Sequence, residues 1–315
     1  MIWIQILLSV SGIAAVLWGA DKFTDGAGSL AARLKVPQMV IGLTVVAFGT
    51  SAPEFFISLV SALQDKSGMA IGNVVGSNIF NVLLIVGMSA ALCSIQISRS
   101  TIRKDLPWAI ASTLLFTFLC LDGRLSRLDG VVLTAVFGVF LFYTFRLARD
   151  GDADQAETPK INGVGRSVMW LLVGLTALIV GSQVFVHGAS AIARALGVSD
   201  LVVGLTIVAG GTSLPELATS VISARKGQSA LALGNVIGSN VFNILMILGI
   251  TAWVTPLSLA GVTWVDYGTL LLSVLLLWWM SYTQLRVTRK EGVVLLLFFA
   301  AYLYWLIHQA LAAAV

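Results

Sequence analysis

The chain carries very little charge. Only 11% of its 315 residues are Asp, Glu, Lys or Arg, whereas 58% are hydrophobic. Because an ordinary soluble chain is about 25% charged, this composition excludes a water-soluble globule. Cysteine and histidine are scarce as well, with two of each in the chain. We interpret the isolated Cys93 and Cys120 as apolar packing residues, and the solitary His187 and His308 give no support to acid–base chemistry through histidine.

Basic residues are missing from the start of the chain, where no Lys or Arg precedes Lys22. A signal peptide needs a basic segment there, so we expect a retained first helix. The net charge of +4 is spread over short loops, a pattern typical of membrane topology and not of nucleic-acid binding.

What the chain has in abundance is long apolar segments, and its mean hydropathy is +0.95. A bilayer core of about 30 Å needs about 20 apolar residues per helix, whereas barrel strands would be about ten residues long with alternating polarity. The sequence therefore predicts an all-α polytopic membrane protein with ten transmembrane helices. The spans are expected at 2–20 (with room to continue to about 31), 37–63, 68–93, 106–121, 126–147, 166–195, 199–224, 228–253, 264–283 and 291–312.

The loops differ in charge between the two sides of the membrane. Alternate assignment puts fourteen Lys and Arg on one side and four on the other. Cytoplasmic loops are enriched in Lys and Arg, so the richer side is predicted to be cytoplasmic and both termini to lie outside the cytoplasm.

An internal repeat divides the chain. Residues 42–81 and 204–243 align without a gap, and 23 of these 40 positions are identical. Five expected spans precede the second copy, and an odd number reverses its orientation. We expect two inverted five-helix repeats at 1–150 and 166–315, joined by a short cytoplasmic linker at 151–165. Inverted repeats with broken helices indicate the midplane site of a secondary transporter.

Each copy places a glutamate inside an apolar segment. The motif reads Gly49-Thr50-Ser51-Ala52-Pro53-Glu54 in the first copy and Gly211-Thr212-Ser213-Leu214-Pro215-Glu216 in the second. Glu54 is eleven residues from Asp65, roughly 16 Å along a helix and thus near the bilayer centre. A carboxylate there costs on the order of 3 kcal/mol and needs a cation, a proton or a polar cavity. A protonated glutamate bonded to a neighbouring helix is the alternative.

The prolines of this motif predict broken helices. Pro53 and Pro215 lack an N–H and release the carbonyls of Gly49 and Gly211, which can then face a cation. A simple packing kink is the alternative interpretation.

The helix after each motif carries a polar stripe. Asn73, Ser77 and Asn81 share one helical face, and Asn235, Ser239 and Asn243 repeat it. Helix–helix packing would also explain such residues. We expect Asn73, Asn78, Asn235 and Asn240 to be mainly structural, and Ser77, Asn81, Ser239 and Asn243 to lie nearer to bound ions.

The candidate ligands are therefore all oxygen atoms, including two carboxylates. Such sets favour hard cations such as Ca²⁺ and Na⁺, and two carboxylates neutralise one divalent ion. Mg²⁺ fits less well because it resists dehydration.

The motif Gly-Thr-Ser-x-Pro-Glu, followed by Gly-Asn-x-x-Gly-Ser-Asn, occurs twice in the chain. Because of these motifs the chain resembles the cation/Ca²⁺ exchanger superfamily, most closely its prokaryotic Na⁺/Ca²⁺ exchangers. The resemblance implies a central divalent site at Glu54 and Glu216 with the carbonyls of Thr50 and Thr212. It also implies flanking Na⁺ sites at the carbonyls of Ala47 and Ala209, the hydroxyls of Ser51, Ser77, Ser213 and Ser239, and Asn81 and Asn243.

The function that this resemblance implies is Na⁺/Ca²⁺ antiport by alternating access, in a prokaryotic inner (plasma) membrane. Ca²⁺ and Na⁺ would be transported ions, with no cofactor and no required protein partner. The first helix of each half would slide over the broken-helix core, with the glycines near 19–28 and 181–188 at that contact. Some relatives, including the K⁺-dependent branch, carry Asp at the position of Asn243, which argues against K⁺ transport here.

Other functions remain open at this point. Proton-coupled relatives typically read Gly-Asn-Ala-x-Glu in place of the motif around Glu54, which favours Na⁺ over H⁺. An exchanger coupled to H⁺ or carrying Mn²⁺ is the nearer alternative. A cation channel that uses the same carboxylates is a remote one. An enzyme is weaker still, because no nucleophile has an evident basic partner.

Overall fold

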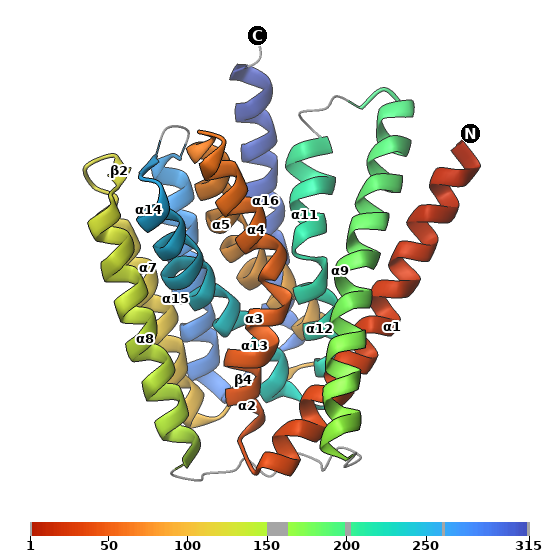
Figure 1. Cartoon of the computed structure of the whole chain (residues 1–315), viewed down its shortest axis with the longest axis vertical. Coiled ribbons are helices and arrows are strands. Elements are labelled where there is room, and N and C mark those ends of the chain that lie inside the picture. Colours follow the sequence, from red (N-terminus) through yellow and green to blue (C-terminus); the bar gives the residue numbers. More distant parts are fainter. Residues whose placement is uncertain (1, 150–162, 199–202, 260–261, 314–315) are drawn as a thin grey trace.

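The computed structural model describes residues 2–149, 163–198, 203–259 and 262–313, and nearly all of this part of the chain is helical (Figure 1). The all-α class that the composition predicts is confirmed. The expected linker lies mostly outside the described residues, as do the first residues of the span expected at 199–224.

The first half contains the following elements: α1 (Ile2–Leu34), α2 (Gln38–Ile41), the π-helical η1 (Gly42–Val46), α3 (Ala47–Thr50), α4 (Ala52–Leu63), α5 (Ser67–Phe80), η2 (Asn81–Val86), α6 (Gly87–Leu92), β1 (Ile95–Gln96), η3 (Thr101–Asp105), α7 (Leu106–Leu119), β2 (Arg124–Leu125) and α8 (Arg127–Arg149). The second half contains α9 (Val164–Ala195), η4 (Gly204–Val208), α11 (Ala209–Thr212), α12 (Leu214–Arg225), α13 (Ser229–Val241), η5 (Phe242–Leu248), α14 (Gly249–Val254), β3 (Leu257–Ser258), α15 (Trp264–Gln284), β4 (Arg286–Val287) and α16 (Arg289–Ala313).

Within the described residues, seven helices are long and apolar enough to cross a membrane, or up to eight if the bent pair Gln38–Thr50 and Ala52–Leu63 is one span. The chain is thus a multi-pass membrane protein, and the count of ten stays a prediction. Both chain ends lie at the upper end of the molecule in Figure 1, whereas α8 ends and α9 begins at the lower end. This arrangement agrees with the prediction that both termini lie on the same side of the membrane.

The centre and the rim of the bundle differ in burial. The segment Ser229–Val254 includes α13 and α14, and 94% of its apolar 18-residue stretch is buried inside the protein. Only 11% of the corresponding stretch of α16 is buried. The segment α13 packs against α2, η1, α7 and α12, so it is a central helix surrounded by both halves. The polar stripe of the second repeat therefore lies in the middle of the molecule.

Glycines at intervals of seven residues bring α1 and α9 into direct backbone contact. A Cβ atom on Gly12 would lie 2.5 Å from the backbone nitrogen of Phe185, and one on Gly19 would lie 2.8 Å from the carbonyl oxygen of Gly174. Small residues allow membrane helices to approach in this way. Our expectation that the glycines near 19–28 and 181–188 face the broken-helix core is wrong for those at this contact. Gly19, Gly26, Gly181 and Gly188 join the two long helices to each other.

Two short strand pairs join the halves. The strands β1 and β4 pair antiparallel with Ile95 opposite Val287, and β2 pairs with β3 with Arg124 opposite Ser258. The shift in numbering that aligns 42–81 with 204–243 also relates the strands, since it takes Ile95 to Leu257 and Arg124 to Arg286. The two pairs are therefore equivalent to each other, and each joins a segment of one half to a non-equivalent segment of the other.

The glycine contact gives the first prediction. Gly174→Val should lower the melting temperature in detergent by roughly 5 °C, because an added Cβ meets the backbone of α1 at 2.6 and 2.7 Å and overpacking costs about 1–3 kcal/mol. Gly138→Val on α8 is the matched control, since a Cβ there meets nothing within 4 Å. Equal losses in the two variants would contradict the proposed contact.

Candidate functional site

The two glutamate motifs lie at breaks between helices. The segment α3 ends at Thr50 and α4 begins at Ala52, and the helical stretch Gln38–Thr50 meets α4 at an angle of 47°. Pro53 lies in the first turn of α4, where a missing N–H breaks no helical hydrogen bond. In the second half, α11 ends at Thr212 and α12 begins at Leu214, with Pro215 in its first turn. The breaks predicted from the prolines are present in both halves.

The carbonyls at these breaks are only partly released. Backbone N–H groups at the helix ends donate to the carbonyls of Gly49 and Gly211. The Ala47 carbonyl, at the start of α3, accepts from the Ser51 N–H at 3.0 Å. The Thr50 hydroxyl also lies 3.4 Å from the Ala47 carbonyl oxygen. Facing an ion would therefore require that hydroxyl to use another of its acceptors, such as Oδ1 of Asn235.

The two carboxylates are buried and held crosswise. Glu54 is 1% exposed and Glu216 is 0% exposed. The Ser51 hydroxyl donates to Oε1 of Glu216 at 3.1 Å, and the Ser213 hydroxyl donates to Oε1 of Glu54 at 3.2 Å. Each serine thus binds the glutamate of the opposite half, and the two motifs form one site.

A pair of asparagines braces the turns that carry the glutamates. Asn73 donates to the backbone carbonyl of Glu54 at 3.2 Å and to the Ser58 hydroxyl at 2.9 Å. In the other half, Asn235 donates to the carbonyl of Glu216 at 3.3 Å and to the Ser220 hydroxyl at 2.9 Å. Thr50 adds a link between the halves by donating to Oδ1 of Asn235 at 3.0 Å.

A second pair of asparagines joins α5 to α13. The amides of Asn78 and Asn240 each donate to the other residue's backbone carbonyl, at 3.3 and 3.4 Å. Their side-chain oxygens accept from the amides of Asn243, at 2.9 Å, and Asn81, at 3.0 Å. The four side chains therefore hold the halves together and fix the orientation of Asn81 and Asn243.

This arrangement leaves buried oxygens with no donor. Among the described residues, no hydrogen-bond partner is found for Oε2 of either glutamate or for Oδ1 of Asn81 and Asn243, and the Ser239 hydroxyl also lacks a partner. Ser77 contributes a further oxygen, 3.4 Å from the Ser213 hydroxyl. A buried acceptor without a partner costs about 1–3 kcal/mol, so such a set calls for a ligand. In the described part of the chain, no three His, Cys, Asp or Glu gather as a metal site, so two carboxylates with neutral oxygens form the candidate set.

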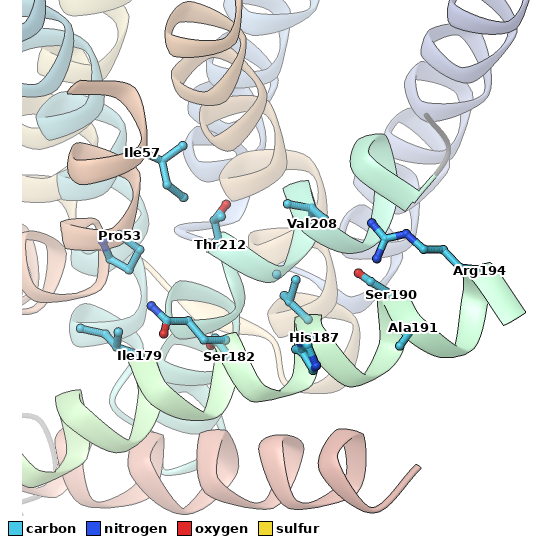
Figure 2. Close-up of a pocket in the computed structure, with 13 residues that line it drawn as sticks. Pro53, Ile57, Ile179, Ser182, His187, Ser190, Ala191, Arg194, Val208 and Thr212 are labelled. Atoms are coloured by element: carbon cyan, nitrogen blue, oxygen red, sulfur yellow. The ribbon is translucent and has the colours of Figure 1, made fainter. Parts of the chain in front are cut away.

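A cavity of about 420 Å³ lies beside this site. It lies between α9 and the helices of both motifs, with Pro53 and Ile57 of α4 facing residues of α9 across it (Figure 2). Gly211 and Thr212 of the second motif also line it, whereas Glu54 and Glu216 do not. The cavity therefore extends along α9 from Arg194 to the residues beside both glutamates.

The residues of α9 that line this cavity were not among the sequence-predicted site residues. Gln183, His187, Ser190 and Arg194 fall at i, i+4, i+7 and i+11 in an otherwise apolar helix, and therefore share one face. That polar stripe is a signal from which they could have been found. Thr219, whose buried hydroxyl has no partner among the described residues, was also missed, although it lies one turn after Glu216.

Three comparisons place this geometry among known proteins. A family model described as sodium/calcium exchanger protein matches residues 4–146 and 166–308. The putative antiporter CaxA of Alkalimonas amylolytica is 40% identical over 306 residues, covering 94% of this chain and 96% of that protein. The sodium/calcium exchanger MaX1 of Methanosarcina acetivorans is 33% identical and covers 96% and 98%. A solved structure of the sodium-calcium exchanger NCX_Mj superposes with a TM-score of 0.84 at 32% identity, covering 96% and 98%.

The asparagine pairs give the second prediction. Asn78→Ala removes the acceptor of Asn243 and should lower the melting temperature by roughly 5 °C, since an unpaired buried amide costs about 1–3 kcal/mol. The double variant with Asn243→Ala should lose less stability than the sum of the losses in the two single variants, because both changes remove the same hydrogen bond. In the control pair, the stability losses of Asn78→Ala and Gln64→Ala should add, since Gln64 is an exposed residue. Strict additivity of the Asn78 and Asn243 changes would refute the contact.

Proposed function

The chain belongs to the sodium/calcium exchanger protein family, and we propose that it exchanges one Ca²⁺ for several Na⁺ by alternating access to the Glu54–Glu216 site. It is a transmembrane antiporter of this family. The family consists of transporters, so no catalytic residues are assigned.

One observation carries the proposal: two buried carboxylates, each held by a serine of the other half, keep one oxygen without a donor. A serine donor is neutral and leaves the carboxylate charge uncompensated. Two negative charges at membrane depth then require cations, and one Ca²⁺ or two Na⁺ supply the same charge. Competition of the two ions for these carboxylates couples their fluxes.

The ligands are assigned as the family resemblance implies. The central Ca²⁺ would bind Glu54, Glu216 and the carbonyls of Thr50 and Thr212. The Na⁺ ions would bind at Ala47, Ala209, Ser51, Ser213, Ser77, Ser239, Asn81 and Asn243. Support comes from the unpartnered oxygens of Asn81, Asn243 and Ser239, and from the burial of these side chains.

Alternating access would use two inverted five-helix repeats, 1–150 and 166–315, with the bend at the membrane midplane. The repeat of 42–81 at 204–243 and the crosswise serine contacts support this arrangement. With the Lys- and Arg-rich loops in the cytoplasm of a prokaryotic inner membrane, the cavity beside α9 opens to the outside. The ion-filled site is neutral and can be occluded, whereas the empty site carries two charges and resists closure.

The carboxylates provide the third prediction. Glu54→Gln and Glu216→Gln should each reduce Na⁺-gradient-driven ⁴⁵Ca²⁺ uptake into proteoliposomes by at least about thirtyfold, because losing one charge of a buried pair typically costs about 2–5 kcal/mol. Both variants should remain folded, since each relieves an uncompensated buried charge. Glu291→Gln, which alters a carboxylate at the start of α16, is the control and should retain exchange. Normal exchange in both midplane variants would disprove the assignment.

The counter-ion provides the fourth prediction. Uptake of ⁴⁵Ca²⁺ should require Na⁺ on the opposite side and should not be driven by a pH gradient alone. Uptake with a pH gradient in Na⁺-free buffer would favour the H⁺-coupled exchanger, and rapid flux without any opposing cation would favour a channel. Competition by excess Mn²⁺ and direct ⁵⁴Mn²⁺ uptake would distinguish an exchanger that carries Mn²⁺.

A further inference from the structure

An ionic cluster joins α1 to the end of α12. The Lys226 ammonium group lies 2.7 Å from a carboxylate oxygen of Asp21 and 2.7 Å from one of Asp25, and it also donates to the Asp21 carbonyl at 2.9 Å. Beneath it, the hydroxyls of Thr24 and Ser223 lie 3.4 Å apart and are fully buried. The cluster therefore covers a closed contact between the first long helix and the helix that carries Glu216.

The corresponding positions of the other half carry no such cluster. Applying the offset of the repeat, Gln183 corresponds to Asp21, His187 to Asp25 and Gln64 to Lys226. The first two line the cavity between α9 and α4, and Gln64 accepts a hydrogen bond from Lys66 in its own loop. The two helix pairs thus occupy equivalent places, but the pair with the ionic cluster is closed and the pair without it is separated by the cavity.

We propose that Asp21, Asp25 and Lys226 form a latch that closes the access route between α1 and α12. The latch favours the state in which the route beside α9 is open. It rests on the proposed alternating access, but not on which ions are carried. In the predicted orientation the latched route faces the cytoplasm.

The solvent exposure of the latch suits a contact that must break in each cycle. The side chains of Lys226, Asp21 and Asp25 are 26%, 40% and 43% exposed, so water screens the ion pairs and limits their strength. Lys22, 3.0 Å from Asp21 and over the ring of Trp170 on α9, adds a second positive charge. When the latch opens, both carboxylates become available to line the route, and they attract cations to it.

The test uses a matched pair of cysteine reporters in a Cys93→Ser, Cys120→Ser background. Ile57 lines the open cavity, and Thr219, its equivalent in the second half, is 0% exposed. We expect a small membrane-impermeant thiosulfonate to react readily with Ile57→Cys and slowly with Thr219→Cys. Lys226→Gln, which installs the residue found at the equivalent position 64, should raise the reaction rate at Thr219→Cys roughly fivefold and leave that at Ile57→Cys equal or lower.

The controls separate a latch from a general loosening. Lys226→Arg, which keeps the positive charge, should keep the slow rate at Thr219→Cys. An unchanged rate in folded Lys226→Gln, a rise at both reporters, or a fast rate in Lys226→Arg would overturn the latch. Labelling does not depend on Ca²⁺ or Na⁺ transport, so failure of the proposed exchange and failure of the latch give different results.

Discussion

The structure depends on placing two carboxylates in one buried site at the centre of a membrane protein. Two like charges there repel each other and are separated from water. Among the hydrogen bonds to their oxygens are those from the hydroxyls of Ser51 and Ser213, and such neutral donors orient the carboxylates without neutralising them. Under the proposed function, such a site holds its negative charge for a mobile cation, whereas a structural ion pair would already have neutralised it.

The surrounding helices follow from this constraint. A continuous helix would direct a single face toward the centre, whereas the breaks at Ser51 and Ser213 turn helix starts and polar side chains toward it. Asn73 and Asn235 then hold the turns after the breaks. Asn78 and Asn240 hold the two halves at a fixed separation. Rigid support of this kind is required because a cation site loses selectivity when its ligands can move apart.

Much of this could be predicted from the sequence. The polar motif around Glu54, its copy around Glu216 and the prolines beside them stand out in an apolar chain, and they indicated a pair of broken helices that meet. The π-helical segments and the two-residue strands could not be predicted, because so few residues carry no periodic pattern. The role of Gly19 and Gly181 was misassigned, since a small residue shows that a helix is approached closely but not by which partner. The cavity depends on how far α9 stands from α4, which no local pattern encodes.

The contacts between the halves are self-complementary. Ser51 binds Glu216 as Ser213 binds Glu54, and the strand pairs repeat in the same reciprocal way. Contacts of this kind define a twofold interface between identical subunits, so a dimer of half-length chains could form every one of them. Such a dimer would have two identical entrances and no preferred side. In the single chain the equivalent positions 226 and 64 carry Lys and Gln, so the proposed latch can make the two faces of the membrane energetically distinct.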